Sequence, residues 1–260
     1  MIIWLASYPR SGNSFTRIVL KHLFDLQSRT IYHHQLSSEV ERMANIVGEP
    51  IERTMTLEEV TAAPDVWIVK THEMPQGDDH PAIHVVRDGR DALVSYAHFI
   101  LYTESRIEIG ADRDAFLRIL EQLVLSDAHF GGWSRNALAW QQRARTVSIR
   151  YEDLLVSPGD LIGAALASFG QSVRVKPSSS LPNFENLHDE FPWFFRKGKI
   201  GTWRTEMPEA LHNLFWECHG EAMTKFGYRR DGAVTDTVLA RGLSEHPSED
   251  AMREAPRRRS

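Results

Sequence analysis

The start of the chain constrains the fold more than any other segment, because an apolar run leads through a short polar loop into an amphipathic stretch. The apolar run is 2–6 (IIWLA), the loop is 8–15 (YPRSGNSF) and the amphipathic stretch is 16–24 (TRIVLKHLF). This order predicts a strand, a tight turn and a helix. The first turn of a helix carries unpaired N–H donors and the positive end of the helix dipole. The loop therefore predicts a binding site for phosphate or sulfate.

Apolar runs alternate with helix-period segments along the rest of the chain. The strands are apolar without interruption, which is typical of a parallel sheet covered on both faces. We therefore predict an α/β fold with a central, mostly parallel sheet flanked by helices. Segment 173–195, with three prolines and three consecutive serines, predicts irregular structure or a lid. Predicted strands are 2–7, 66–70, 83–87 and 146–150, and predicted helices are 14–26, 38–46, 57–62, 91–102, 114–126, 132–145, 161–169 and 208–226.

The loop is not a Walker A motif, which requires a lysine and a hydroxyl residue directly after its last glycine. Here the cation Arg10 precedes Gly12, and no lysine follows the glycine. An ordinary Gly/Ser turn and a nucleotide kinase of the P-loop type both stay open as interpretations of this segment alone.

Four segments resemble those of sulfotransferases that use 3′-phosphoadenylyl sulfate (PAPS), and they occur in that family's order. Loop 8–15 resembles the family's 5′-phosphosulfate loop, Tyr-Pro-Lys-Ser-Gly-Thr/Asn-Thr/Ser-Trp. Segment 70–72 (KTH) resembles its catalytic segment, and 84–99 resembles its 3′-phosphate segment. Segment 196–204 (RKGKIGTWR) is close to its Arg-Lys-Gly-x-x-Gly-Asp-Trp-Lys. The resemblance implies a soluble, bacterial-type small-molecule sulfotransferase with the P-loop-NTPase-like sulfotransferase fold.

The resemblance implies three catalytic residues. His72 would be the general base, a task that suits histidine because its pKa lies near neutrality. Lys70 would neutralise the sulfuryl group in the transition state, and it lies two residues before His72, so an extended backbone points both to one side. Arg10 would stabilise the leaving phosphate from the position where the family usually has lysine. Arginine is a poor proton donor, so a role as an acid is not expected of it.

The resemblance also implies a binding site for PAPS and its product, 3′-phosphoadenosine 5′-phosphate (PAP). Phe15 replaces the family's tryptophan and would either stack on adenine or pack in the core. Tyr151 would lie near adenine or serve in packing, and Asn183-Phe184 is a weak second match for an adenine contact. The cofactor-binding residues implied are Arg10, Ser11, Gly12, Asn13, Ser14 and Phe15 at the 5′ side, Tyr151 at adenine, and Arg87, Ser95, Arg196, Lys197 and Gly198 at the 3′-phosphate.

Residues beside these motifs are expected to have structural roles. Asp88 is expected to cap the helix that carries the 3′-phosphate serine, because aspartate is a favoured N-cap residue. Arg90 and Asp91 are expected in surface pairs or capping contacts. Thr202 and Arg204 depart from the family's aspartate and lysine, and we expect them to affect loop structure more than chemistry.

Composition limits the classes of partner. The net charge is −5 and the pI is about 6.2, so bulk charge does not indicate a binder of nucleic acid or of an acidic membrane. No apolar run approaches the length of a transmembrane helix. We therefore expect a cytoplasmic location and no membrane anchor. The single cysteine, Cys218, fits a reducing compartment and is expected to be a buried thiol. No metal-ligand spacing is present, and the family needs no metal.

The chain is predicted to contain a single sulfotransferase domain over 1–230 and a flexible tail over 231–260, which ends in three arginines at 257–259. The expected partner is a small-molecule acceptor with a hydroxyl or amine, and a homodimer stays open. Segments 99–106, 130–140 and 191–195 are expected to line the acceptor pocket. A catalytically silent PAP-binding module is the non-enzyme alternative. A flat or apolar acceptor is suggested by the aromatic residues of these segments, Phe99, Tyr102, Trp133, Trp140 and Trp193.

Overall fold

Five strands form one parallel sheet in the order β2-β3-β1-β4-β5. The computed structural model describes residues 1–30, 38–48, 57–62, 65–105, 110–177, 179–192 and 194–235. Every residue of β1, β4 and β5 is buried, including the polar residues of β5, so these strands are covered on both faces. The predicted α/β class is confirmed. The strands are β1 (Ile2–Ala6), β2 (Ser28–Thr30), β3 (Trp67–Thr71), β4 (Ala82–Val86) and β5 (Thr146–Arg150).

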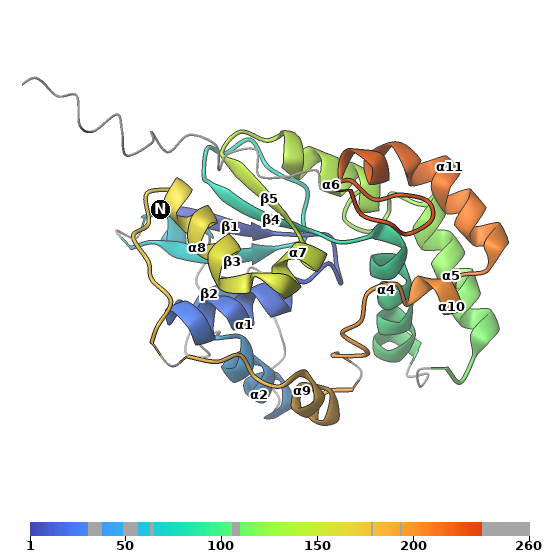
Figure 1. Cartoon of the computed structure of the whole chain (residues 1–260), viewed down its shortest axis with the longest axis horizontal. Helices are drawn as coiled ribbons and strands as arrows, with labels where there is room; N and C mark the ends of the chain where they lie inside the picture. The colour runs from blue at the N-terminus through green and yellow to red at the C-terminus, as the bar shows by residue number, and fades with distance from the viewer. Residues whose placement is uncertain are drawn as a thin grey trace, which may run out of the picture.

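Helices cover the sheet and also form a second group beyond the carboxyl ends of its strands (Figure 1). In the second group α4 contacts α5, and α11 contacts α4, α5 and α6. Short helices α7, α9 and α10 were not predicted, and α9 lies in the segment expected to be irregular. The helices are α1 (Asn13–Phe24), α2 (Ser38–Val47), α3 (Leu57–Ala62), α4 (Gly89–Ser105), α5 (Arg113–Leu125), α6 (Trp133–Gln142), α7 (Tyr151–Val156), α8 (Pro158–Ser168), α9 (Phe184–Glu190), α10 (Trp203–Glu206) and α11 (Glu209–Lys225).

Two large apolar clusters hold these layers together. One lies between the sheet and helices α1 and α8, with Ile3 and Ile83 from the strands against Val19 and Ile162 from the helices. The other lies within the second helix group and is built around the fully buried Trp133. Burial of one such side chain is worth roughly 1.5–3 kcal/mol, so the clusters fix the position of each strand end relative to α4 and α6.

Cys218 is exposed, so the expectation of a buried thiol is wrong. Helix α11 turns Phe215, His219, Ala222 and Met223 toward the core, a stripe with helical spacing, and Cys218 falls outside that stripe. The apolar pattern of the segment indicated the helix correctly, but it did not show where the buried face of that helix ends.

The C-terminal part of the described chain ends in a turn. Tyr228 and Val234 form an antiparallel bridge, and Thr235 donates its backbone N–H to the carbonyl oxygen of Gly227 over 2.8 Å. Most of the predicted tail, including the basic run 257–259, lies outside the described residues, as does Trp193. Within the described ranges, no helix has both the length and the apolar character needed to cross a membrane.

Candidate active site

A cavity of about 520 Å³ opens at the carboxyl edge of the sheet. Strands β3, β1 and β4 are neighbours, and the residues that follow each of them line this cavity: His72 after β3, the loop with Arg10 after β1, and Arg87 after β4. The chain reverses its direction across the sheet at β1, and such switch points are where ligands bind in open α/β sheets. The cavity therefore gathers the three segments that the sequence placed at one edge.

The loop after β1 forms a tight cradle at the start of α1. Gly12 has φ 108°, and a Cβ there would lie 2.4 Å from the ring of Tyr151, so only glycine fits. Asn13 donates from Nδ2 to the carbonyl oxygen of Leu5 over 3.0 Å and so ties the helix start to β1. The buried Oγ of Ser11 has no hydrogen-bond partner in the described structure. A buried hydroxyl without a partner beside a helix N-terminus suits an anionic ligand.

Phe15 and Tyr151, the two residues predicted to lie near adenine, are brought together in the structure. Both line the cavity, and their rings pack edge to face with centroids 6.2 Å apart. Phe15 also packs against the apolar cluster under the sheet. The two interpretations of Phe15, as a stacking surface and as a core residue, are therefore compatible. Ser14 lines the cavity beside it.

A hydrogen bond to the backbone of the neighbouring strand end holds the His72 ring in one orientation. Its Nδ1 lies 2.7 Å from the carbonyl oxygen of Ser7. A carbonyl oxygen only accepts, so Nδ1 carries the hydrogen in the neutral ring and Nε2 carries the lone pair. Burial and the neighbouring Lys70 ammonium lower the pKa of His72 to about 3, which keeps the imidazole neutral at physiological pH. Lys70 and His72 both line the cavity.

Arg10 connects the loop to two other parts of the site. Its Nε donates to Ser95 Oγ over 3.1 Å, and its Nη2 donates to the carbonyl oxygen of Phe194. The guanidinium carbon lies 5.3 Å from the ring centroid of Phe99 and 4.9 Å from that of Phe194. Burial, together with the charges of Arg87 and Arg196, lowers the pKa of Arg10 to about 10, so it stays cationic at neutral pH.

Arg87, which follows β4, connects the loop after β1 to the segment that contains Lys199. Its Nη1 donates to the carbonyl oxygen of Arg10 over 3.1 Å, and its Nη2 donates to that of Lys199 over 3.0 Å. The guanidinium also lies over the ring of Tyr151, 4.9 Å from the centroid. Its buried Nε has no partner in the described structure. The structure thus brings Arg87 and Ser95 to the cavity, as the spacing of 84–99 predicts.

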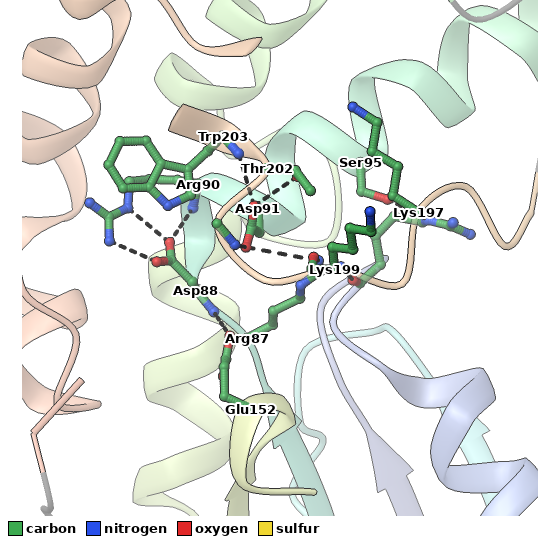
Figure 2. Close-up of polar contacts among 12 residues, drawn as sticks. Arg87, Asp88, Arg90, Asp91, Ser95, Glu152, Lys197, Lys199, Thr202 and Trp203 are labelled. Carbon is green, nitrogen blue, oxygen red and sulfur yellow. Dashed lines mark hydrogen bonds and ion pairs between the residues drawn. The ribbon is translucent and has the colours of Figure 1, made fainter. Parts of the chain in front are cut away.

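Asp91 is fully buried, so the expectation of a surface pair is wrong for it. Figure 2 shows its carboxylate facing Thr202 and Trp203. It accepts from the backbone N–H of Gly201 over 2.6 Å, from Thr202 Oγ1 over 2.9 Å and from the N–H of Trp203 over 3.0 Å. Asp91 thus fixes the end of the 196–204 segment, and Thr202 takes part in loop structure as expected.

Arg90 is also fully buried and pairs with Asp88 (Figure 2). Its Nη2 lies 2.7 Å from Asp88 Oδ2, and its guanidinium carbon lies 3.9 Å from the ring centroid of Trp203. Asp88 Oδ1 accepts the backbone N–H of Arg90 over 2.9 Å, which confirms the predicted cap of α4. Buried arginines are favoured where planar stacking and paired donors are both used, which explains why Arg90 is in the interior.

Glu206 binds both Arg196 and Lys197, the basic pair of the 196–204 segment. The sequence analysis did not identify it. Its Oε1 accepts from Arg196 Nη1 over 2.9 Å and from Lys197 Nζ over 2.8 Å, and its Oε2 lies 2.6 Å from His98 Nε2. Burial alone would raise the pKa of Glu206, but the hydrogen bonds from His98 and Lys197 and the charge of Arg196 lower it well below its usual range. Arg196 and Lys197 line the cavity.

Gly198 lies close to the ring of Phe184. Gly198 has φ 58°, and a Cβ there would lie 2.5 Å from the Phe184 ring, so this position also requires glycine. Phe184 lines the cavity, whereas Asn183 caps α9 by accepting the N–H of Glu185 over 2.7 Å. The weak match at 183–184 therefore divides into one cavity residue and one helix cap.

Aromatic side chains surround the part of the cavity next to His72. Tyr96, Phe99, Phe130 and Phe194 line it, and the ring centroid of Phe130 lies 5.7 Å from that of His72. Trp133 and Trp140 were expected here, but they are buried in the apolar clusters and do not line the cavity. They lie on the face of α6 that packs in the core. The sequence pattern did not show which aromatic residues of 130–140 face the core and which face the cavity.

Among the described residues, no group of three or more His, Cys, Asp or Glu side chains could hold a metal ion.

Comparisons with known proteins agree with this geometry. The sulfotransferase domain family matches residues 2–227, so the chain belongs to that family. Sulfotransferase 1E1 of Mus musculus is 26% identical over 187 residues, which is 60% of this chain and 61% of that protein's length. Sulfotransferase 6B1 of Danio rerio is 24% identical over 229 residues, covering 79% of this chain and 73% of the relative.

Solved structures show the same fold. Mouse sulfotransferase SULT7A1 complexed with PAP superposes with a TM-score of 0.58 at 19% identity, over 85% of this chain and 83% of the other. Retinol dehydratase in a complex with retinol and PAP gives a TM-score of 0.57 at 17% identity, over 88% and 82%. The predicted P-loop-like sulfotransferase fold is confirmed.

Proposed function

We propose that this chain transfers a sulfuryl group from PAPS to the hydroxyl or amine of a small-molecule acceptor, with His72 as general base. The observation that carries the proposal is the placement of His72, whose hydrogen-bonded Nδ1 leaves the lone pair on Nε2, in one cavity with Lys70 and the anion loop. Membership of the sulfotransferase family and the likeness to two structures that contain PAP support it.

The residues present fit PAPS. The cradle at Gly12, which a Cβ would fill, and the buried Ser11 Oγ suit the 5′-phosphosulfate. The side chains of Arg87 and Arg196 each keep a buried Nε without a partner in the described structure, and both line the cavity. We assign these two, with Ser95, Lys197 and Gly198, to the 3′-phosphate. Asn13, Ser14, Phe15 and Tyr151 complete the nucleotide site.

The reaction needs proton removal from the acceptor and stabilisation of charge on the donor side. When bound, PAPS supplies an electrophilic sulfur and a phosphate leaving group. His72 Nε2 takes the acceptor proton as the acceptor's oxygen or nitrogen bonds to sulfur. The bond between sulfur and the phosphate oxygen breaks, and its electron pair stays on that oxygen. Lys70 holds positive charge near the sulfuryl oxygens, and Arg10 does the same near the departing phosphate oxygen. The depressed pKa of His72, about 3, keeps its base form available at physiological pH.

The acceptor side favours an apolar molecule with one nucleophilic group. Tyr96, Phe99, Phe130 and Phe194 provide ring surfaces in the cavity that His72 and Lys70 also line, and the Phe130 ring lies next to His72. A highly anionic acceptor would find few polar partners on those rings, whereas a flat apolar one would bury its surface there.

A PAPS assay with a panel of phenols, alcohols and amines tests the proposal. We expect PAP release with at least one acceptor, without added metal, and a loss of about 10²–10⁴ in kcat for His72→Ala with PAP affinity kept. Thermal shifts with PAP and ATP, with and without magnesium, serve as the control. Stabilisation by ATP and magnesium alone would indicate a kinase, and stabilisation by PAP without turnover on any acceptor would indicate a silent binding module. A His72→Ala variant with near-normal kcat would remove the base assignment.

A further inference from the structure

The backbone that carries His72 leaves the sheet one residue earlier. Strand β3 ends at Thr71, where it still pairs with β1, so the carbonyl groups of His72 and Glu73 have no place in the ladder. His72 is half-buried and Glu73 is exposed, so their carbonyl groups can accept from water or from donors elsewhere in the fold.

Helix α6 supplies both partners. Asn136 Nδ2 donates to the carbonyl oxygen of His72 over 2.9 Å, and Trp140 Nε1 donates to that of Glu73 over 2.9 Å. The two side chains are four residues apart and so lie on one face of the helix. Asn136 is fully buried and Trp140 almost so, which fixes the positions of both donors.

Asn136 also holds the aromatic wall opposite the base. Its Nδ2 makes a second donation, over 2.9 Å, to the carbonyl oxygen of Phe130. Phe130 has φ 55° and is followed by Gly131 and Gly132 with φ 82° and 70°, so this turn is left-handed throughout. Left-handed backbone at a non-glycine residue persists only when its surroundings hold it. One amide group therefore fixes both His72 and the ring that faces it.

We propose that Asn136 and Trp140 are positioning residues that set the place of the base relative to the acceptor wall. This rests on the proposed function, because it takes His72 as the base. Both bonds end on backbone carbonyls, so their removal would move the whole 72–73 segment rather than one side chain. The Nδ1 bond to Ser7, which selects the tautomer of His72, depends on that same segment.

The test compares Asn136→Leu and Trp140→Phe with Leu120→Ala. Both variants remove the donor: Asn136→Leu keeps the branched shape of the side chain, whereas Trp140→Phe also removes part of the ring. Leu120 is a buried α5 residue outside the cavity lining, and Leu120→Ala serves as a control for lost volume and reduced stability. Measurements are kcat and KM for one acceptor, PAP affinity by calorimetry, and the imidazole nitrogen shifts of labelled His72. All are made well below each variant's unfolding temperature.

We expect kcat to fall by about 100-fold in Asn136→Leu and about 10-fold in Trp140→Phe, since small misplacements of a reacting group cost this much. PAP affinity should be unchanged, and the shifts of His72 should lose the pattern of a single Nδ1–H tautomer. Leu120→Ala should change none of these. Wild-type kcat and wild-type shifts in Trp140→Phe would overturn the positioning role even if Asn136→Leu cannot be obtained folded.

The failure of the proposed function would look different. If His72→Ala kept its activity, the base assignment would be wrong, while the imidazole shifts would still report whether the α6 donors hold the ring. If His72→Ala were inactive but both α6 variants kept normal kcat and shifts, the base would stand and the positioning role would fall.

Discussion

Arg10→Lys should be strongly damaging, although lysine is the usual residue at this position in the sulfotransferases that the loop resembles. The guanidinium donates to Ser95 Oγ over 3.1 Å with one nitrogen and to the Phe194 carbonyl with another, and it also contacts two aromatic rings. A lysine ammonium is a compact point charge that cannot reproduce this planar fork. The loop is therefore built around the guanidinium rather than around positive charge alone.

The size of the effect follows from the hydrogen bonds and ring interactions that a lysine cannot make. A hydrogen bond from a charged donor contributes about 1.5–3 kcal/mol, and each cation–π interaction roughly 0.5–1 kcal/mol when partly exposed. Lysine can keep one hydrogen bond and part of the ring interaction, so we expect a loss of about 2–3 kcal/mol in transition-state stabilisation, or about 30- to 150-fold in kcat. Arg10→Ala removes the charge as well and should be worse than Arg10→Lys.

Steady-state kcat with one acceptor, measured for both variants, decides whether the loop needs the guanidinium or only a positive charge. PAP affinity is a second readout. Since Arg10 anchors Phe194, which lines the acceptor side, KM for the acceptor should rise in Arg10→Lys as well. Wild-type kcat in Arg10→Lys would show that only charge matters there. Wild-type kcat in Arg10→Ala would remove Arg10 from the mechanism.

Three further variants test other parts of the structure. Arg87→Ala should weaken PAP by roughly 1.5–3 kcal/mol and adenosine 5′-phosphosulfate by less, because only PAP has a 3′-phosphate; equal weakening by calorimetry would make Arg87 structural. Glu206→Ala should lower the free energy of unfolding by about 3 kcal/mol, since it strands buried Arg196, and an unchanged urea midpoint would contradict this. Burial lowers the pKa of His84 to about 3, so below pH 6.5 the unfolded chain binds a proton that the folded chain does not. Wild-type stability should then fall by about 1.4 kcal/mol per pH unit relative to His84→Gln, and parallel pH profiles of the two proteins would refute the buried neutral state.

The fold could be predicted where burial leaves a continuous apolar pattern. Strands β1, β3 and β4 were found because each contains an apolar run buried in the sheet, and β5 was found although polar residues alternate with Val147 and Ile149 in it. Strand β2 was missed because its sequence, Ser28-Arg29-Thr30, is polar and lies at an edge of the sheet. Helices α7, α9 and α10 were missed. They have six, seven and four residues, so a helical period shows only weakly in them, although α3, with six residues, was found.

The residues of the candidate site also fall into those that the sequence predicted and those that it did not. The loop at Gly12, the base segment and Arg87 were predicted because their motifs are local and each follows a strand. Glu206 and Asn136 were missed because each acts on residues far away in the sequence. No local pattern tells a helix-end glutamate that binds a distant arginine from one that faces water. Arg90 and Asp91 were expected in surface pairs or capping contacts, and their burial was missed because their partners in 201–203 and 229–230 lie in segments that the sequence does not connect to them.

The residues assigned to PAPS also hold the 194–203 segment in place. Arg10 donates to the Phe194 carbonyl and Arg87 to the Lys199 carbonyl, while Asp91 accepts from residues 201–203. The segment is thus fixed by the same cations that face the cavity, and it needs little further ordering when an anion arrives. Binding that avoids such ordering loses less conformational entropy. A change at Arg10 or Arg87 therefore acts twice, once on the charge offered to the ligand and once on the wall that encloses it, and the two effects should not be additive in the double variant.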